Sequence, residues 1–190
     1  MTLFRVSGPD AEPVTPAEAK AELRIDHVSE DELIAGLIRA AREEVEHATG
    51  IAMIDQTWRL AADHIPASGL LRLRRGPVKE ILAVTTFGSE GEAALVDPAD
   101  YQLDPLSKPA RLHFSKQPGR LRAMNGIEVD FTAGFGEAGT DVPDLLKRAV
   151  LMLVAHWFEF RAHFGASSQP VSYPDGYRRL ISPYLPRRLG

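Results

Sequence analysis

The sequence of 190 residues contains no cysteine, and this absence excludes three kinds of chemistry. Disulfide cross-links, thiolate catalysis and cysteine-ligated zinc all require a thiol. The chain also lacks any apolar run close to the roughly 20 residues that cross a bilayer. Residues 1–10 lack the apolar core of a signal peptide. We therefore predict a protein that does not enter a membrane and is made in a cytoplasm.

The sequence also lacks an excess of positive charge. It holds 22 basic and 26 acidic residues, for a net charge of -4. A dedicated nucleic-acid-binding protein would usually be clearly basic. With 44% hydrophobic residues, a chain of this length can bury one core. We therefore expect one domain, or one domain that carries an insertion.

Helical patterns lie near both ends of the chain. Residues 15–18 (TPAE) have the form of a capping box, with proline at the first helical position. A longer helix is predicted over residues 30–49, because apolar residues recur there at helical spacing and Gly50 suits a C-terminal cap. The apolar residues are Leu33, Leu37, Ala41, Val45 and Ala48.

The most apolar helix is predicted over residues 143–163. Its apolar side chains cover more than half of the helix circumference, which is typical of a helix central to a core. A last helix follows residues 174–176 (PDG) and carries Tyr177 and Ile181 on one face.

Between these helices, residues 56–134 hold six or so short runs rich in β-branched and aromatic residues, separated by proline and glycine. Residues 127–131 (IEVDF) alternate cleanly between apolar and polar, as in a strand with one buried face. Short strands at this spacing favour a small antiparallel sandwich or barrel.

Segregated runs of helices and strands predict an α+β fold. We expect a single domain in which residues 15–55 and 141–185 form a helical bundle, with a β insertion at residues 56–134. Residues 1–14 and 186–190 are expected to be flexible arms. The predicted core of the bundle is Leu33, Leu37, Val45, Leu146, Val150, Leu153 and Trp157.

Two patterns invite an interpretation as enzyme sites. His156, Glu159 and His163 share a helical face, but the outer two lie about 10 Å apart along the axis, too far for one ion. Gly134, Gly136 and Gly139 have the spacing of a nucleotide loop, yet no short βαβ unit surrounds them. No serine stands in a G-x-S-x-G elbow. We therefore expect no catalytic residue, metal or cofactor.

The C-terminal segment carries the pattern most suggestive of function. Arginines are interleaved with tyrosines there, and both residue types are enriched at protein interfaces. A docking segment is the favoured interpretation, with a positive lining near DNA and a solvated helix as alternatives. The residues predicted to dock are Arg178, Arg179, Tyr184, Arg187 and Arg188.

An ordered series of short segments resembles the head–tail connector, or adaptor, proteins of long-tailed phages and gene transfer agents. The resemblance covers nearly the whole chain, although no single segment is specific and Phe158 stands where the family typically has tyrosine. The segments are residues 14–20, 23–24, 40–43, 46, 49–50, 56–58, 76–78, 131–136, 142–143, 149–159, 161, 180–181 and 183–184.

The resemblance implies a structural protein without catalytic residues. Such proteins form rings, usually of twelve copies, between the portal and the tail-side stopper or tail terminator. DNA passes through the channel without specific binding. The protein would then lie in the neck of a particle, after assembly in the host cytoplasm. A small metal- or nucleotide-binding enzyme and a DNA-binding accessory module remain the alternatives.

Overall fold

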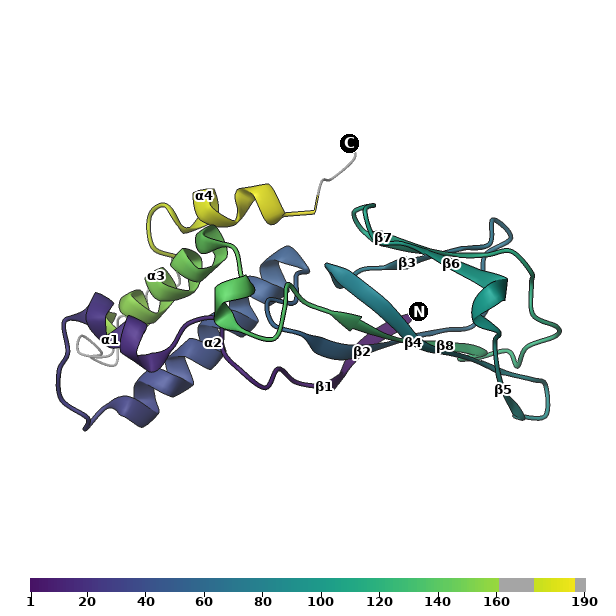
Figure 1. The fold of residues 1–190 in the computed structure, drawn as a ribbon, viewed down its shortest axis with the longest axis horizontal. Helices are drawn as coiled ribbons and strands as arrows, with labels where there is room; N and C mark the ends of the chain where they lie inside the picture. The colour runs from purple at the N-terminus through teal and green to yellow at the C-terminus, as the bar shows by residue number, and fades with distance from the viewer. Residues whose placement is uncertain (161–172, 187–190) are drawn as a thin grey trace, which may run out of the picture. The chain divides into compact units, whose positions relative to one another are not determined.

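The computed structural model describes residues 1–160 and 173–186. The chain folds as two compact units, and each is drawn from separate stretches of sequence (Figure 1). The strand unit comprises residues 1–9 and 55–135, and the helical unit comprises residues 10–54 and 136–190. The fold is α+β, as predicted, and every strand pairing in the described residues is antiparallel.

The larger sheet of the strand unit has five strands in the order β1-β2-β8-β4-β5. The central strand, β8, has alternating side chains fully buried and pairs with β2 on one side and β4 on the other. The bounds are β1 Thr2–Ser7, β2 Gln56–Ala62, β4 Val78–Phe87, β5 Ala93–Leu95 and β8 Ile127–Ala133.

The smaller sheet has the order β3-β7-β6, with bounds Leu70–Leu73, Ala110–Phe114 and Tyr101–Asp104. The short helix η1, Pro98–Asp100, leads into β6. Burial alternates along β7, so that one face of this sheet is buried and the other is exposed. Two antiparallel sheets with period-two burial agree with the alternation in the sequence.

The predicted flexible arm at residues 1–14 is wrong for residues 2–7, which form β1 at the edge of the larger sheet. β1 is hard to recognise in the sequence because an edge strand pairs on one side only. Its side chains are mostly exposed, and Phe4 and Val6 are among them. No alternation of apolar and polar residues marks such a strand.

The helical unit begins with α1, Pro16–Leu23, whose Thr15 and Glu18 form the predicted capping box. The other elements are α2 Asp31–Thr49, η2 Gly139–Asp141, α3 Asp144–Phe160, α4 Tyr177–Ile181 and η4 Ser182–Tyr184. α3 packs against α1, α2 and α4. Gly50 caps α2 in the left-handed conformation, as predicted. No helix in the described part of the chain is both long and apolar enough to span a membrane.

The buried stripe of α2 is rotated by one residue from the predicted one. Ile34 and Ile38 are buried, whereas Leu33 is 38% exposed and Leu37 is half-buried. The prediction of Leu33 as a core residue is therefore wrong. The cause is that two charged residues, Arg42 and Glu46, lie on the buried stripe and displace the apparent apolar pattern.

The remaining residues of the predicted core lie as follows. Val45, Leu146, Val150 and Leu153 are at most 1% exposed. Trp157 is half-buried among the described residues. The interior of the helical unit therefore contains one face of α2 and the residues of α3 between Leu146 and Val154 that point inward.

Arg42 and Glu46 are buried as a pair, with a nitrogen–oxygen distance of 3.1 Å. Arg42 also donates through Nε to Glu12, at 2.8 Å, and the backbone N–H of Met53 donates to Glu46, at 2.8 Å. Burial alone would lower the pKa of the Arg42 guanidinium, but the hydrogen bond to Glu12 and the charge of Glu46 raise it above its ordinary value. The pair thus fixes α2 to the segments on either side of it.

Candidate docking surface

The C-terminal segment predicted to dock is anchored on the helical unit by its apolar side. Tyr177 and Ile181 are each 3% exposed, and α4 packs against α3. The Tyr173 ring stacks on Tyr177 with centroids 5.0 Å apart, and the Tyr173 hydroxyl donates to Glu44 on α2. Two tyrosines therefore hold α4 in place, and its polar side faces outward.

The predicted docking residues differ in their exposure. Arg178 and Arg179 are exposed, and neither forms an ion pair with another described residue. Tyr184 is half-buried in η4. Arg187 and Arg188 lie outside the described residues. The structure therefore brings Arg178 and Arg179 together at the surface, while their role in docking stays a prediction.

A groove of about 480 Å³ lies beside these arginines, between α2 and the C-terminal segment. Burial, followed by the negative charge of Glu44, raises the pKa of the Tyr177 phenol far above its ordinary value, so the phenol stays protonated. The groove combines aromatic, aliphatic and charged groups, as protein interfaces do. Its lining residues are Glu44, Ala48, Tyr173, Pro174, Asp175, Gly176, Tyr177, Arg178, Ile181 and Leu185.

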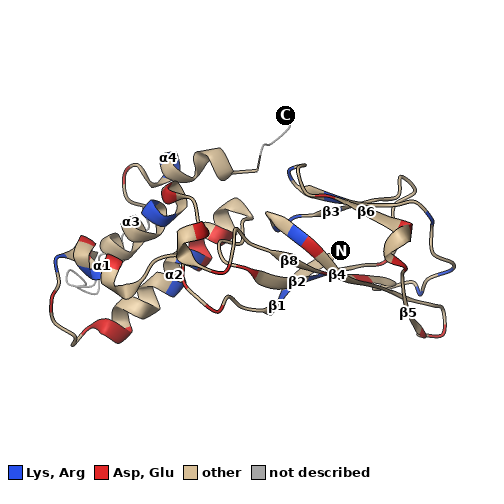
Figure 2. Ribbon diagram, in the orientation of Figure 1, with Lys and Arg blue, Asp and Glu red and all other residues tan. Residues whose placement is uncertain are grey.

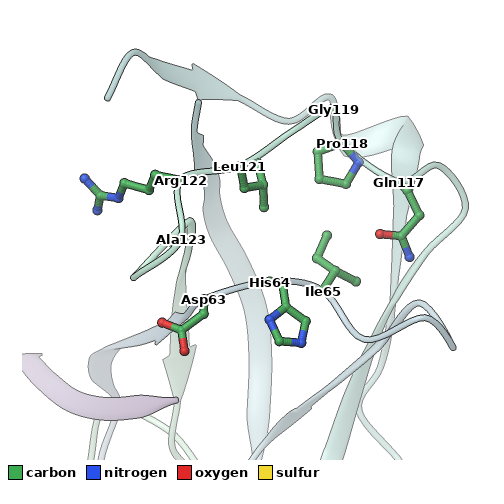
Figure 3. A pocket seen from close by; sticks show the side chains of 9 residues that line it. All are labelled: Asp63, His64, Ile65, Gln117, Pro118, Gly119, Leu121, Arg122 and Ala123. Atoms are coloured by element: carbon green, nitrogen blue, oxygen red, sulfur yellow. The ribbon is translucent and has the colours of Figure 1, made fainter. Parts of the chain in front are cut away.

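A second pocket, of about 280 Å³, lies in the strand unit between the loop after β2 and the loop before β8 (Figure 3). Its polar groups hold the loops to one another. The backbone N–H of Asn125 donates to Asp63, and Arg122 donates to the carbonyl of Asn125, both at 2.9 Å. The Arg122 guanidinium also lies 4.0 Å from the centre of the Phe87 ring. These contacts stabilise the loops, and none of them indicates a ligand.

Of the histidine pattern considered as a metal site, the structure describes two of the three residues. His156 and Glu159 lie on α3, where the His156 ring meets the edge of Phe160 with centroids 4.3 Å apart. His163 lies outside the described residues. The described residues contain no group of three His, Asp or Glu side chains that could hold a metal ion.

The glycine pattern after β8 has a steric explanation. β8 is flanked by antiparallel strands, so the parallel βαβ unit that binds a dinucleotide is absent there. A Cβ atom at Gly134 would lie 2.5 Å from the backbone nitrogen and Cα of Asp55. A Cβ atom at Gly139 would lie 2.8 Å from the carbonyl oxygen of Pro13. Because Gly134 and Gly139 have no Cβ atom, the backbone at each of them can lie directly against the backbone of Asp55 or Pro13.

We expect Gly134→Ala to lower the free energy of unfolding of the strand unit by about 1–3 kcal/mol, because the backbone at Asp55 must shift to admit the methyl group. Gly119→Ala is the control, since nothing lies within 4 Å of a Cβ atom there. Urea titrations of both variants would check this. Equal midpoints for the two variants would contradict the steric explanation.

Comparisons with known proteins agree with the resemblance in the sequence. The family described as phage gp6-like head-tail connector protein matches residues 15–74, and no curated protein matches the chain. A structure of the neck of an empty gene transfer agent (GTA) particle, computed with C6 symmetry, contains a chain with a TM-score of 0.84 and 25% identity. A chain in the virion of a native GTA particle has a TM-score of 0.82 and 27% identity.

A third similar chain, with a TM-score of 0.71 and 28% identity, comes from the neck of a native GTA particle computed with C12 symmetry. Each alignment covers 100% of this chain and 98% of the other chain. The likeness therefore extends over the strand unit and the helical unit alike. Residues 15–74 therefore match the head–tail connector family, and the whole chain is similar to chains from the neck and virion of GTA particles.

Proposed function

We propose that the chain is one subunit of a ring, of twelve copies, in the neck of a phage-like particle. The observation that carries this proposal is the alignment over the whole chain with a neck protein, at a TM-score of 0.84. One similar neck structure was computed with C12 symmetry, which supports the copy number. A closed ring with one contact surface on each side is also the arrangement that repeated head-to-tail contacts produce.

In this ring, the portal would lie on one side and the tail-side stopper or tail terminator on the other, with a channel for DNA between them. The two chain ends, residues 15–55 and 141–185, would act as one helical bundle, with residues 56–134 as its β insertion. The packing of α3 on α1, α2 and α4 supports the bundle. The net charge of -4 suits a channel that lets DNA slide without gripping phosphate.

The docking segment would bind the portal through arginines 178, 179, 187 and 188 and Tyr184. Arg178 and Arg179 support this because they project from a helix whose buried side is fixed by Tyr177 and Ile181. Arginine suits such a contact because its guanidinium binds carboxylates with two parallel hydrogen bonds.

Electron microscopy of the purified protein, alone and mixed with the portal protein from the same genome, tests the proposal. We expect portals that carry an added twelve-fold layer. We expect Arg178→Glu/Arg179→Glu to weaken portal binding at least tenfold, with Lys116→Glu/Arg120→Glu as a control that reverses two exposed charges in the strand unit. Bare portals at every concentration would overturn the connector function. Unchanged binding by the Arg178→Glu/Arg179→Glu variant would overturn only the docking segment.

A further inference from the structure

The exposed face of the smaller sheet places arginines side by side on neighbouring strands. In the β3–β7 register Arg72 lies opposite Arg111, and both side chains are exposed. Residues directly opposite in an antiparallel pair have Cβ atoms about 4.5–5.5 Å apart on the same face. Arg74, two residues beyond Arg72, is exposed as well. We call Arg72, Arg74 and Arg111 the basic face.

Only one of these three charges is balanced within the strand unit. Arg111 donates to Asp104 on β6 through Nε, at 3.0 Å, and Nη2, at 2.6 Å. The Ser107 hydroxyl and Arg111 together lower the pKa of Asp104 to about 2, so this pair stays charged at neutral pH. Arg72 and Arg74 form no ion pair with any residue that the structure describes.

This arrangement is unfavourable for an isolated sheet. Like charges directly opposite each other destabilise an antiparallel pair, and Asp104 is occupied by Arg111. A negatively charged partner over Arg72 and Arg74 would remove this repulsion. The partner must present carboxylates or phosphates at a surface.

The helical unit has a surface of complementary character in the turn between α1 and α2. Residues 26–32 hold four acidic residues and neither lysine nor arginine, and Figure 2 shows the acidic segments of this turn in red. Asp31 is paired with Lys20 at 2.7 Å. Asp26 and Glu32 are exposed, and neither forms an ion pair with a described residue.

The same turn exposes two apolar side chains close to its acids. Val28 is 75% exposed, and Leu33, the first apolar residue of α2, is 38% exposed. Acidic and apolar groups close together suit a protein surface with arginines, because arginine stems cover apolar atoms while the guanidinium groups bind carboxylates. We call residues 26–33 the acidic turn.

We propose that the basic face of one copy binds the acidic turn of a second copy, and that this contact repeats around the ring. The inference rests on the proposed ring function and names one contact that closes the ring. Two different surfaces of the same chain make a heterologous contact, which is the type that generates rings. A second copy is favoured over DNA because the basic face is small and Asp104 neutralises its Arg111, whereas phosphate binding draws on many cations.

Two charge-reversed variants test the contact. Arg72→Glu/Arg74→Glu reverses the basic face, and Asp26→Lys/Glu32→Lys reverses the acidic turn. Neither variant removes an ion pair found among the described residues. Each variant alone would bring like charges together at every contact in the ring. We expect each to weaken ring assembly at least tenfold, measured by mass photometry and electron microscopy with and without the portal protein.

The decisive sample is an equimolar mixture of the two variants. In an alternating ring, every reversed face would meet a reversed turn of opposite charge, and every unchanged face would meet an unchanged turn. We expect rings to reappear with six copies of each variant, which native mass spectrometry would identify. A folding defect could not be repaired in this way, because neither variant would supply the other with a folded chain.

The control is Lys116→Glu/Arg120→Glu, which reverses two exposed charges outside the basic face and should assemble like the wild type. Normal rings from either reversed variant alone, or no rings from their mixture, would overturn the proposed contact. Rings that form normally but lose salt-sensitive DNA binding when the basic face is reversed would assign that face to DNA instead. If the wild-type protein and the control both fail to form rings, the proposed function itself fails, and the contact fails with it.

Discussion

Replacing Glu46 by alanine is expected to lower the free energy of unfolding of the helical unit by about 3–5 kcal/mol. The Glu46 carboxylate accepts hydrogen bonds from the guanidinium of Arg42, at 3.1 Å, and from the backbone N–H of Met53, at 2.8 Å. Both Arg42 and Glu46 are less than 5% exposed. Alanine would take one carboxylate away from the buried Arg42 guanidinium, which would keep Glu12, and would leave the buried N–H of Met53 without its acceptor.

The companion variant is Arg42→Met/Glu46→Met, which removes both charges. An apolar pair of similar volume is often tolerated where a single unpaired charge is not. We therefore expect the double variant to be more stable than Glu46→Ala. It should remain less stable than the wild type, because Glu12 and the backbone N–H of Met53 each lose a hydrogen-bond partner. Denaturation followed by circular dichroism would measure both. A double variant as unstable as Glu46→Ala would show that the loss comes from packing rather than from an unpaired charge.

The buried pair of Arg42 and Glu46 also explains why the sequence predicts the wrong buried stripe for α2. An apolar stripe is recognised by its spacing, and α2 offers two, one through Leu33 and Leu37 and the other through Ile34 and Ile38. The second stripe continues through Arg42 and Glu46, which look solvent-exposed until their partners are known. Glu12 lies 30 residues away from Arg42 in the sequence, so no local pattern reveals that the charge is matched inside the fold.

Local sequence patterns predicted correctly those features that depend on residues close together in the sequence. The capping box at Thr15, the end of α2 at Gly50 and the alternation along β8 were all predicted, because each depends on residues within a few positions. β1 was missed because its pairing with β2 joins residues at least 50 positions apart. The basic face was missed for the same reason, since Arg72 and Arg111 meet only through strand register.

The docking segment illustrates a further limit of sequence reasoning. Composition identified Arg178 and Arg179, and the structure adds that Tyr177 and Ile181 anchor the helix that carries them. What these arginines bind is a property of an assembly, because a surface charge has a function only when its partner is present. The resemblance to connector proteins, spread over ordered short segments, suggested the proposed function, which no single motif indicated.

Phe131→Ala is expected to cost the strand unit about 3–5 kcal/mol, the range for a buried phenylalanine truncated to alanine. Phe131 is 0% exposed at the middle of β8, opposite Trp58 on β2 and Ile81 on β4. Loss of the ring leaves a cavity between three neighbouring strands. Phe131→Leu keeps most of the volume and should cost less than about 1.5 kcal/mol.

Hydrogen exchange measured by mass spectrometry would show which strands and helices lose stability in Phe131→Ala. Because the chain forms two compact units, each with buried residues of its own, we expect Phe131→Ala to speed exchange in β2, β4 and β8 far more than in α2 and α3. Glu46→Ala should give the opposite pattern. If each variant instead speeds exchange equally across the whole chain, the two units unfold as one, and stabilising either unit would then stabilise the entire chain.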